Sequence, residues 1–372
     1  KDLLIHLPYE SFDESVVNFL YSAANDKDVL AIKQTLYRVS SSSPVVQALE
    51  KAVQNGKQVT VLMEVKARFD EANNILMARR LEKAGAHVIY GLVGLKTHSK
   101  CTLVIRREKD GIRRYVHVAT GNYNASTAKL YTDLGILTCS DRFGIDASAF
   151  FNLLSGYSDP PIWDSFIVAP INLRQRCIEL IDREIHFAKN GEDAHMIAKM
   201  NSLLDKGIIE KLYEASQAGV KIELIVRGIC VLIPGIPGVS DNITVRSIVG
   251  RFLEHSRIFW FRNGGREELY VSSADWMPRN LNDRVELMVP IEDPEIKRRL
   301  KQMVDIELSD NQKAHIMQAD GTWLKTISAE NQLCAQEYFQ KIAEKRDAED
   351  EMTLAQKLEP YTPVLGHGDG SD

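Results

Sequence analysis

Long apolar runs are missing from this sequence of 372 residues. No stretch reaches the roughly 18 consecutive apolar residues that a membrane-spanning helix needs, so we predict a globular, soluble chain. The first residues, KDLLIHLPYE, contain neither a signal-peptide core nor an initiating Met, which predicts a piece of a longer protein.

Paired cysteine motifs are also missing. The five cysteines are odd in number, widely spaced and without a CxxC pair, which argues against a disulfide framework and against a zinc site. We therefore expect the protein to reside in a reducing cytoplasm. The stretches GIPG and RNGG lack the spacing of a Walker phosphate-binding loop, so we predict ordinary loops there.

The chain has no excess of positive charge. Its formal net charge of −5 does not favour general binding of nucleic acid or of an anionic membrane. A polyanion would have to bind a locally basic tunnel, which only clustered arginines and lysines supply. The basic segments RREKDGIRR and RRLKQ are candidates for its approach, although a solvated surface is the simpler interpretation of either.

Helix and strand signals alternate in the first half. Ser11 and Glu14 have capping-box spacing, and Ser43 with Pro44 predicts the start of a second helix that Gly56 ends. The apolar segments DVLAIKQTLYR, VTVLMEV and AHVIY read as strands around helices, whereas KCTLVIRR and RRYVHVAT flank a polar turn and predict a hairpin. We expect an α/β fold with a mixed, mainly parallel sheet flanked by helices.

This order of elements occurs twice. GKQVTVLMEV parallels GVKIELIVRG, VGLKTHSK parallels VGRFLEHSR, and a third pair of segments sets Asn122 against Asp275 and Asp133 against Glu286. We predict two homologous domains over residues 1–160 and 161–310, with the boundary in SGYSDPPIWDS. Residues 311–372 are predicted to form a C-terminal helical segment and a flexible tail.

One pair of residues suits phosphate chemistry. His98 and Lys100 place an imidazole and an ammonium on the same strand face, where the imidazole can attack phosphorus and the lysine can stabilise negative charge. A lone His-x-Lys occurs by chance in many chains. Its recurrence as His255 with Arg257 favours function over packing, because two copies face to face would surround a single phosphoryl group.

The duplication, with the segments HSK and GNYN, resembles the phospholipase D superfamily, whose motif continues from His-x-Lys to an Asp. This chain departs from that motif, because Ile105 stands where the Asp belongs and Arg257 replaces the second Lys. Ordinary phosphodiesterase chemistry is therefore disfavoured.

Within that superfamily the chain resembles the polyphosphate kinases of the first type through LYRV, EVKARFDEANN, GLKTHSK, ATGNYN, KLYTDLG, IVRGIC and FLEHSRI. The resemblance implies two tandem phospholipase D-like domains with the active site in the cleft between them. It also implies reversible transfer of the ATP γ-phosphate to polyphosphate through a phosphohistidine at His98, with His255 as a second catalytic histidine. ATP, ADP and polyphosphate are then the substrates, and Mg²⁺, carried with ATP, is the cofactor.

The resemblance also assigns binding residues. Tyr131, Arg227 and His255 occupy ATP-contacting positions, and Arg38 and Arg68 occupy the family's magnesium and phosphate site. An arginine cannot ligate Mg²⁺, so we interpret both as phosphate clamps beside a metal held by phosphate oxygens and water. A purely structural interpretation is the alternative for these residues. In it the arginines are solvated surface residues, and Tyr131 packs at the start of a strand.

Three further residues are predicted to act beside His98. Lys100 would contact the same phosphate, and Asn122 and Asn124 would bind phosphate or orient the imidazole. His6, His87, His117, His186 and His195 lack a repeat partner or a matching motif, and we predict structural or exposed positions for them.

The resemblance finally implies a cytoplasmic enzyme, open to peripheral association with the inner membrane, that forms a homo-oligomer as a full-length protein and binds no nucleic acid. Two alternatives stay open. One is a phospholipase D-like phosphodiesterase. The other is a phosphate-binding fragment without turnover, because the family's full-length chain carries two further N-terminal domains.

Overall fold

The predicted alternation of strands and helices in the first half is present in a computed structural model of the chain, which describes residues 1–40, 42–65, 71–156 and 162–357. The strands of this half are β1 (Leu3–Leu7), β2 (Val29–Leu36), β3 (Gln58–Met63), β4 (His87–Tyr90), β5 (Lys96–Thr97), β6 (Cys101–Glu108), β7 (Gly111–Ala119) and β8 (Tyr131–Thr138). Its helical segments are η1 (Asp13–Val17), α1 (Asn18–Asn25), α2 (Pro44–Gln54), α3 (Glu71–Ala84), η2 (Thr127–Lys129) and α4 (Asp141–Leu154).

The predicted start of the second helix is confirmed, whereas the first helical turn has Phe12 as its N-cap, one residue after Ser11. Ser11 Oγ accepts the backbone N–H of Glu14 at 3.2 Å. Ser43 Oγ accepts a backbone N–H of the first turn of α2 at 3.3 Å, and Pro44 is the first residue of that helix. Gly56 follows α2 with a φ of +78°, which glycine adopts without the steric cost of a Cβ. The π-helical turn η1 ahead of α1 was not predicted.

The second half repeats this arrangement. Its strands are β9 (Ile167–Ala169), β10 (His195–Met200), β11 (Lys221–Val226), β12 (Ile243–Ile248), β13 (Leu253–Glu254), β14 (Arg257–Phe261), β15 (Glu268–Ser272), β16 (Arg284–Pro290), β17 (Ala314–Met317) and β18 (Trp323–Lys325). Its helical segments are α5 (Leu173–Lys189), α6 (Lys206–Gln217), η3 (Asn263–Gly265), α7 (Pro278–Asn282), α8 (Pro294–Leu308) and α9 (Ala335–Lys357).

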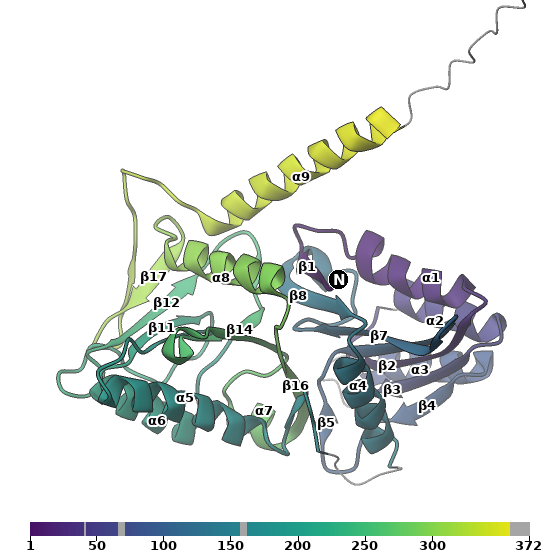
Figure 1. Ribbon diagram of the computed structural model, residues 1–372, viewed down its shortest axis with the longest axis horizontal. Helices are drawn as coiled ribbons and strands as arrows, with labels where there is room; N and C mark the ends of the chain where they lie inside the picture. Colours follow the sequence, from purple (N-terminus) through teal and green to yellow (C-terminus); the bar gives the residue numbers. More distant parts are fainter. Residues whose placement is uncertain (41, 66–70, 157–161, 358–372) are drawn as a thin grey trace, which may run out of the picture.

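The sequence repeat is therefore a repeat of structure. The unit β2, α2 and β3 corresponds to β10, α6 and β11, the strands β6, β7 and β8 correspond to β14, β15 and β16, and α4 corresponds to α8 (Figure 1). The apolar residues that the repeat sets opposite one another on β3 and β11 are all buried: Val59, Val61, Met63, Ile222, Leu224 and Val226.

Each half builds a mixed sheet, which confirms the α/β class, but the mainly parallel character that we predicted is wrong. The sheets run β1-β8-β7-β6-β2-β3-β4 and β18-β17-β12-β11-β10-β14-β15-β16-β5. The strand–helix–strand units supply the parallel runs β2-β3-β4 and β10-β11-β12. Antiparallel pairs outnumber parallel ones among the described strands, because hairpins such as β6-β7 and β14-β15 add their strands antiparallel.

Two short strands cross between the halves. β5 of the first half pairs in parallel with β16 of the second, and β13 of the second half pairs in parallel with β8 of the first. Each half therefore extends the sheet of the other.

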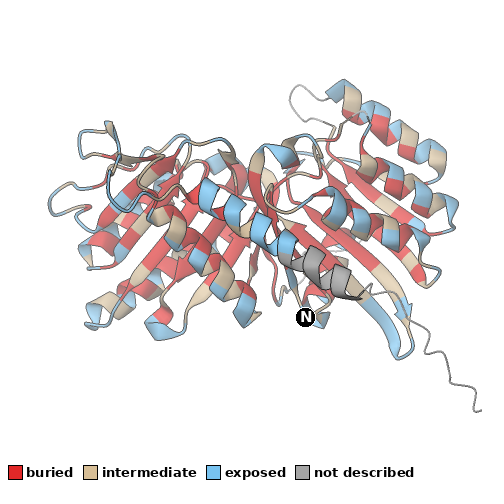
Figure 2. Cartoon of the chain, turned by 90° about the horizontal axis from the view of Figure 1, so that it is seen from above, coloured by how far each residue is buried: buried red, intermediate tan, exposed pale blue. Residues whose placement is uncertain are grey.

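The core also spans both halves. One cluster of buried apolar side chains combines Leu103 and Phe150 of the first half with Trp260 and Leu300 of the second. Figure 2 shows the strands as mostly buried and the outer faces of the helices as exposed. The contact between the halves is therefore a packed apolar layer as well as a set of hydrogen bonds.

Residues 311–334 do not form the helical segment that we predicted. β17 pairs with β12 and β18 pairs with β17, so this stretch extends the second sheet. The hairpin forms because Ala314 and Met317 are buried and Gly321 takes a φ of +82° in the connecting turn. The helical signal belongs to α9, which projects from the body (Figure 1). Residues 157–161 of the predicted boundary and the predicted flexible tail lie outside the described residues.

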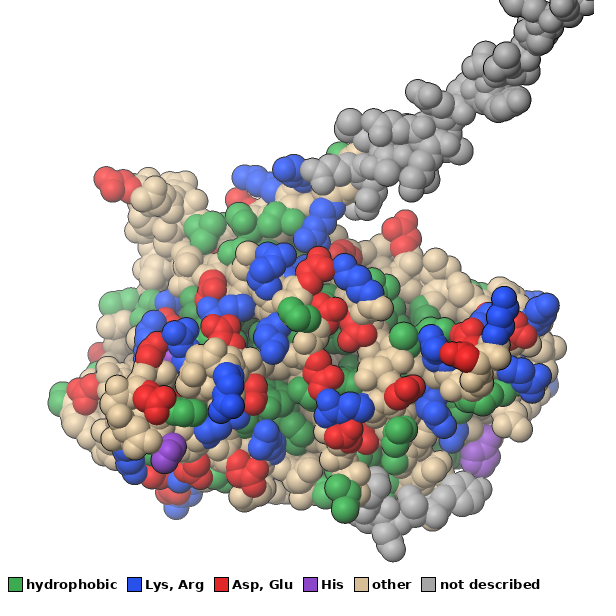
Figure 3. Space-filling model, in the orientation of Figure 1, with side chains coloured by type: hydrophobic (Ala, Val, Ile, Leu, Met, Phe, Trp, Pro, Cys, Tyr) green, Lys and Arg blue, Asp and Glu red, His purple; other side chains and the backbone are tan. Residues whose placement is uncertain are grey.

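The helices and the surface carry mixed charge. Within the described ranges, no helix, α9 included, has an apolar stretch long enough to cross a bilayer. On the face shown in Figure 3, Lys and Arg side chains are interspersed with Asp and Glu. That face offers no large field of one sign to attract a polyanion.

Candidate active site

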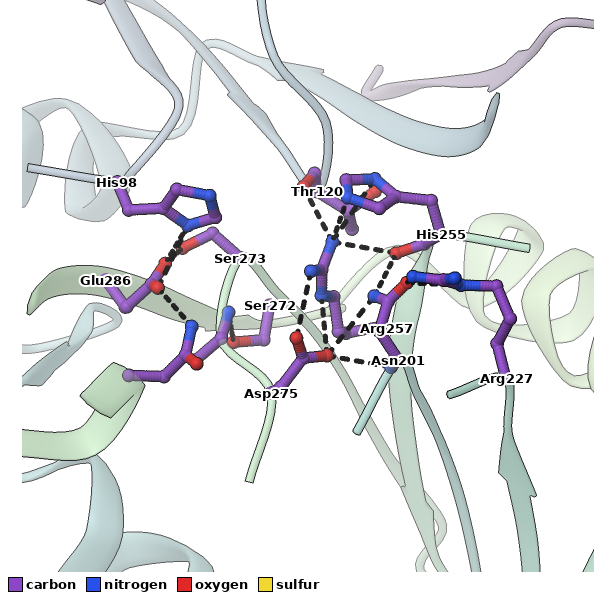
Figure 4. A network of polar contacts seen from close by, with 12 residues as sticks. His98, Thr120, Asn201, Arg227, His255, Arg257, Ser272, Ser273, Asp275 and Glu286 are labelled. Carbon is purple, nitrogen blue, oxygen red and sulfur yellow. Dashed lines mark hydrogen bonds and ion pairs between the residues drawn. The ribbon is translucent and has the colours of Figure 1, made fainter. Parts of the chain in front are cut away.

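His98 is placed by the crossing strand β5. β5 ends at Thr97, and the backbone N–H of His98 continues its pairing with β16 by donating to Val285 O at 2.9 Å. The next residue of β16 is Glu286, and His98 Nδ1 lies 2.9 Å from its carboxylate (Figure 4). A histidine of the first half is thus oriented by a carboxylate of the second.

His255 has the reciprocal arrangement. It follows β13, and its backbone N–H donates to Thr132 O of β8 at 3.3 Å. The next residue of β8 is Asp133, whose carboxylate lies 2.9 Å from His255 Nδ1. The exposed fractions of the two imidazole side chains are 10% for His98 and 13% for His255.

The surroundings of His98 keep its ring neutral. Burial lowers the pKa of His98 to about 3, although the Glu286 carboxylate opposes this shift. Burial alone would raise the pKa of Glu286, but contacts with His98, Lys100 and Ser273 hold it below its usual value. The pair is therefore a carboxylate and a neutral imidazole, with the proton on Nδ1 and a lone pair on Nε2. That is the form in which an imidazole acts as a nucleophile.

One cation stands beside each histidine. Lys100 is 2% exposed, its Nζ donates to the carbonyl oxygen of His98, and burial lowers its pKa to about 7. Arg257 is 3% exposed, and its Nη1 donates to His255 O at 2.7 Å. Arg257 Nε also contacts Asp275 at 3.1 Å, so its charge is balanced inside the protein. Each cation is therefore held against the backbone of the histidine beside it.

Tyr131 and Arg227 lie next to His255. The Tyr131 ring centroid is 5.2 Å from that of His255. Arg227 Nε and Nη2 donate to Asn201 Oδ1 at 2.9 and 2.8 Å, and Asn201 Nδ2 donates to His255 O at 3.0 Å (Figure 4). Tyr131 and Arg227 also line one cavity of about 450 Å³. The structure thus brings together the three residues for which the resemblance implied contacts with ATP.

The remaining predicted residues differ in their surroundings. Arg38 follows β2, and its guanidinium carbon lies 5.8 Å from the Tyr37 ring, which is 4.8 Å from the His98 ring. Asn122 Oδ1 is buried without a hydrogen-bond partner among the described residues. Asn124 Oδ1 accepts two backbone N–H groups at 3.0 and 3.1 Å, so it holds its own turn. Arg68 lies outside the described residues.

Sequence reasoning missed the roles of Glu286 and Asp133. The repeat set these two residues opposite one another, and a carboxylate at the same place in both halves was a usable signal. Their partners were not predictable from the repeat alone, because each carboxylate serves the histidine of the other half. Asn201, which links Arg227 to His255, was also missed.

The described residues do not fit a resident metal ion. Within these ranges, no group of three or more His, Cys, Asp or Glu side chains is arranged to hold one. The two carboxylates nearest the histidines are occupied by imidazole nitrogens. A divalent cation at this site would therefore have to arrive with oxygen ligands of its own.

Comparisons with known proteins identify the family of the chain. A family model described as polyphosphate kinase C-terminal domain 1 matches residues 1–160, and one described as C-terminal domain 2 matches residues 166–336. A polyphosphate kinase of Halalkalibacterium halodurans is 60% identical over 84% of this chain and 44% of its own length. One of Synechocystis is 55% identical over 92% of this chain and 48% of its own length. The chain thus spans about half the length of these curated relatives.

Solved structures give the same result. The crystal structure of a polyphosphate kinase from Porphyromonas gingivalis matches with a TM-score of 0.87 and 39% identity, over 94% of this chain and 53% of that one. A phosphatidylserine synthase of Haemophilus influenzae matches with a TM-score of 0.54 and 12% identity, over 91% of this chain and 92% of that one. The second likeness concerns the fold alone.

Proposed function

The chain belongs to the polyphosphate kinase family, and from this premise we propose that it transfers the γ-phosphate of ATP reversibly to polyphosphate through a phosphohistidine at His98. One observation carries the choice of His98. Its Nδ1 is held by Glu286 across the interface between the halves, so the neutral ring keeps the lone pair on Nε2, and the buried Lys100 donates to the carbonyl oxygen of the same residue.

In the first proposed step, His98 Nε2 attacks the γ-phosphorus of ATP. The N–P bond forms while the bond from phosphorus to the bridging oxygen breaks, and ADP leaves with that electron pair. Glu286 retains the Nδ1 proton contact, which stabilises the positive charge that the ring acquires. Lys100 and Arg257 stabilise negative charge on the oxygens of the transferring group.

In the second proposed step, a terminal oxygen of a polyphosphate chain attacks the same phosphorus. The N–P bond breaks, and its electron pair returns to Nε2 of His98. We assign proton exchange with the acceptor to His255, because Asp133 holds its Nδ1 and the Arg257 guanidinium lies 3.2 Å from its Nε2, where a phosphate oxygen would also be attracted. With ADP as the acceptor, the same step forms ATP.

We place the nucleotide next to His255. Tyr131 and Arg227 line the cavity of about 450 Å³, where an aromatic ring and a guanidinium suit a nucleotide and its phosphates. Mg²⁺ belongs to this proposal as the ion that ATP carries, held by phosphate oxygens and water, and it screens the phosphate charge. Arg38 would act as a phosphate clamp, and the same role for Arg68 stays a prediction.

The cytoplasmic location, the lack of a nucleic-acid partner and the homo-oligomer of the full-length protein also stay predictions. The whole relatives are about twice as long as the chain. A fragment that binds phosphate without turnover is therefore the competing proposal, and the next experiment separates it from the kinase.

The test is acid-labile, base-stable incorporation of ³²P from γ-labelled ATP with Mg²⁺. We expect label on the parent chain, no label on His98→Ala, and undiminished label on His186→Ala, whose histidine is exposed on α5. Chelation of Mg²⁺ should abolish labelling in every sample. Label that persists on His98→Ala would move the nucleophile elsewhere. A parent chain that binds polyphosphate but takes no label would contradict the kinase proposal for this chain.

A further inference from the structure

The segment that leads into His255 is held by a side chain of the C-terminal helix. Gln336, the second residue of α9, is 4% exposed. Its Nε2 donates to Phe252 O at 2.9 Å, and its Oε1 accepts the Phe252 N–H at 3.0 Å. One side-chain amide thus pairs with both backbone groups of a residue three positions before His255, as a neighbouring strand would.

The same amide reaches the residue directly before His255. Gln336 Nε2 also donates to Glu254 Oε1 at 2.6 Å. The other carboxylate oxygen of Glu254 accepts Thr132 Oγ1 at 2.8 Å and Lys199 Nζ at 2.7 Å. Because Thr132 precedes Asp133 on β8, this network joins α9 to both strands that bring His255 and Asp133 together.

The network is buried and most of its polar atoms have hydrogen-bond partners, so the loss of one side chain leaves others without a partner. Lys199 Nζ also contacts Glu307 of α8, and the side chains of Lys199, Glu254 and Glu307 are 2% to 3% exposed. A buried polar group that loses its partner costs far more than the net gain of the bond. Gly250 makes room for the amide, since a Cβ there would lie 2.3 Å from Gln336 Oε1.

We propose that Gln336 is a positioning residue for phosphotransfer, because it fixes the place of the His255 imidazole opposite Asp133 through Phe252 and Glu254. The inference rests on the function proposed above for His255. Gln336 itself need not touch nucleotide or polyphosphate. The start of a helix that projects from the body (Figure 1) therefore sets the geometry of the second histidine.

The first test observes the imidazole without relying on activity. The full chain is labelled with ¹⁵N-histidine, and the ring signals of His255 are assigned with His255→Ala. We expect one tautomer, with the proton on Nδ1, in the parent chain and mixed tautomers in Gln336→Ala. The His98 signals should not change, which serves as an internal check that the fold persists. An unchanged His255 signal in Gln336→Ala would overturn the proposal.

The matched control is Gln340→Ala, one turn later on the same helix. Gln340 is exposed, and its Nε2 contacts Glu344 of the same helix at 3.0 Å. This control should leave the His255 signals as they are. Gly250→Ala displaces the Gln336 amide from the opposite side, and we expect it to reproduce the mixed tautomers.

The second test is kinetic. Gln336→Ala should lower kcat by about tenfold, which corresponds to a rise of about 1.4 kcal/mol in the activation barrier, while the KM for ATP changes by less than about twofold. In a His255→Ala background the same substitution should cause no further loss, because it acts only through that ring. An equal loss in both backgrounds would place its action elsewhere. If the parent chain lacks turnover, the proposed function fails, and the tautomer measurement still decides the positioning role.

Discussion

His98 and His255 each present Nδ1 to a carboxylate, yet the cations beside them differ. Burial lowers the pKa of Lys100 to about 7. Burial also opposes the charge of Arg257, but Asp275 holds the pKa of this guanidinium above its usual value. The cation beside His98 therefore titrates near neutral pH, whereas the cation beside His255 keeps its charge.

This difference predicts an alkaline loss of activity. Lys100 carries its charge below about pH 7 and loses it as the pH rises through that value, so kcat/KM for ATP should fall above about pH 7. Lys100→Arg should remove the decline, because an arginine stays protonated throughout this range. The fold has a precedent for the larger side chain, since Arg257 occupies the equivalent place. A decline of the same size in the pH profile of Lys100→Arg would contradict the assignment.

At the residue scale, the sequence predicted the two histidines and their cations because a repeated short motif is visible in the chain itself. It did not predict that Glu286 and Asp133 orient them. Those contacts join residues 188 and 122 positions apart in the chain. These contacts depend on how the two sheets pack against each other. A local pattern of polar and apolar residues does not predict that packing.

At the scale of elements, local signals were sufficient for most of the first half. The N-cap of Ser43 and the hairpin of β6 and β7 depend on residues close in sequence, and both are confirmed. The crossing strands β5 and β13 contain two residues each. They are too short to show an alternating pattern, so they were invisible in the sequence although they place both histidines.

The surroundings of Asp133, near the start of β8, leave little space for added atoms. A Cβ at Gly121 would lie 2.0 Å from the Asp133 carboxylate. Gly121→Ala should therefore displace Asp133, loosen His255 and lower the free energy of unfolding by about 1–3 kcal/mol, as overpacking commonly does. Urea denaturation measures the loss, and phosphotransfer assays should show a parallel fall in rate.

Gly207→Ala is the control for that substitution. A Cβ at Gly207, in the first turn of α6, would meet Asp205 Oδ1 at an ordinary contact distance of 3.5 Å. An alanine there should be neutral or slightly stabilising, because glycine in a helix costs about 0.5–1 kcal/mol relative to alanine. Equal losses in the two variants would argue against the steric explanation.

At the scale of the whole molecule, the halves depend on each other. They exchange β5 and β13, and one apolar cluster draws side chains from both. The sequence predicted two homologous domains, and nothing in the repeat indicated how much structure they share. A repeat reveals similarity within a chain, whereas a shared core depends on contacts between its copies.

The shared core predicts a single unfolding transition for the described body of the chain. Differential scanning calorimetry should give one peak, with a ratio of calorimetric to van't Hoff enthalpy near one, as expected for a cooperative unit. The chain must be heated under conditions where unfolding reverses. Two resolved peaks would mean that the halves are stable separately and that the exchanged strands add little.

The crossing of β5 and β13 has a consequence for specialisation. If two identical subunits exchanged strands in this way, each substitution would appear on both sides at once, and the surroundings of the two histidines would stay alike. Here one polypeptide supplies both sides, so Lys100 can occupy the position that Arg257 has in the other half, and Glu286 the position of Asp133. Because the two halves belong to one chain, their equivalent residues can differ. One imidazole is able to become the carrier of the phosphoryl group while its counterpart is tuned for a different task.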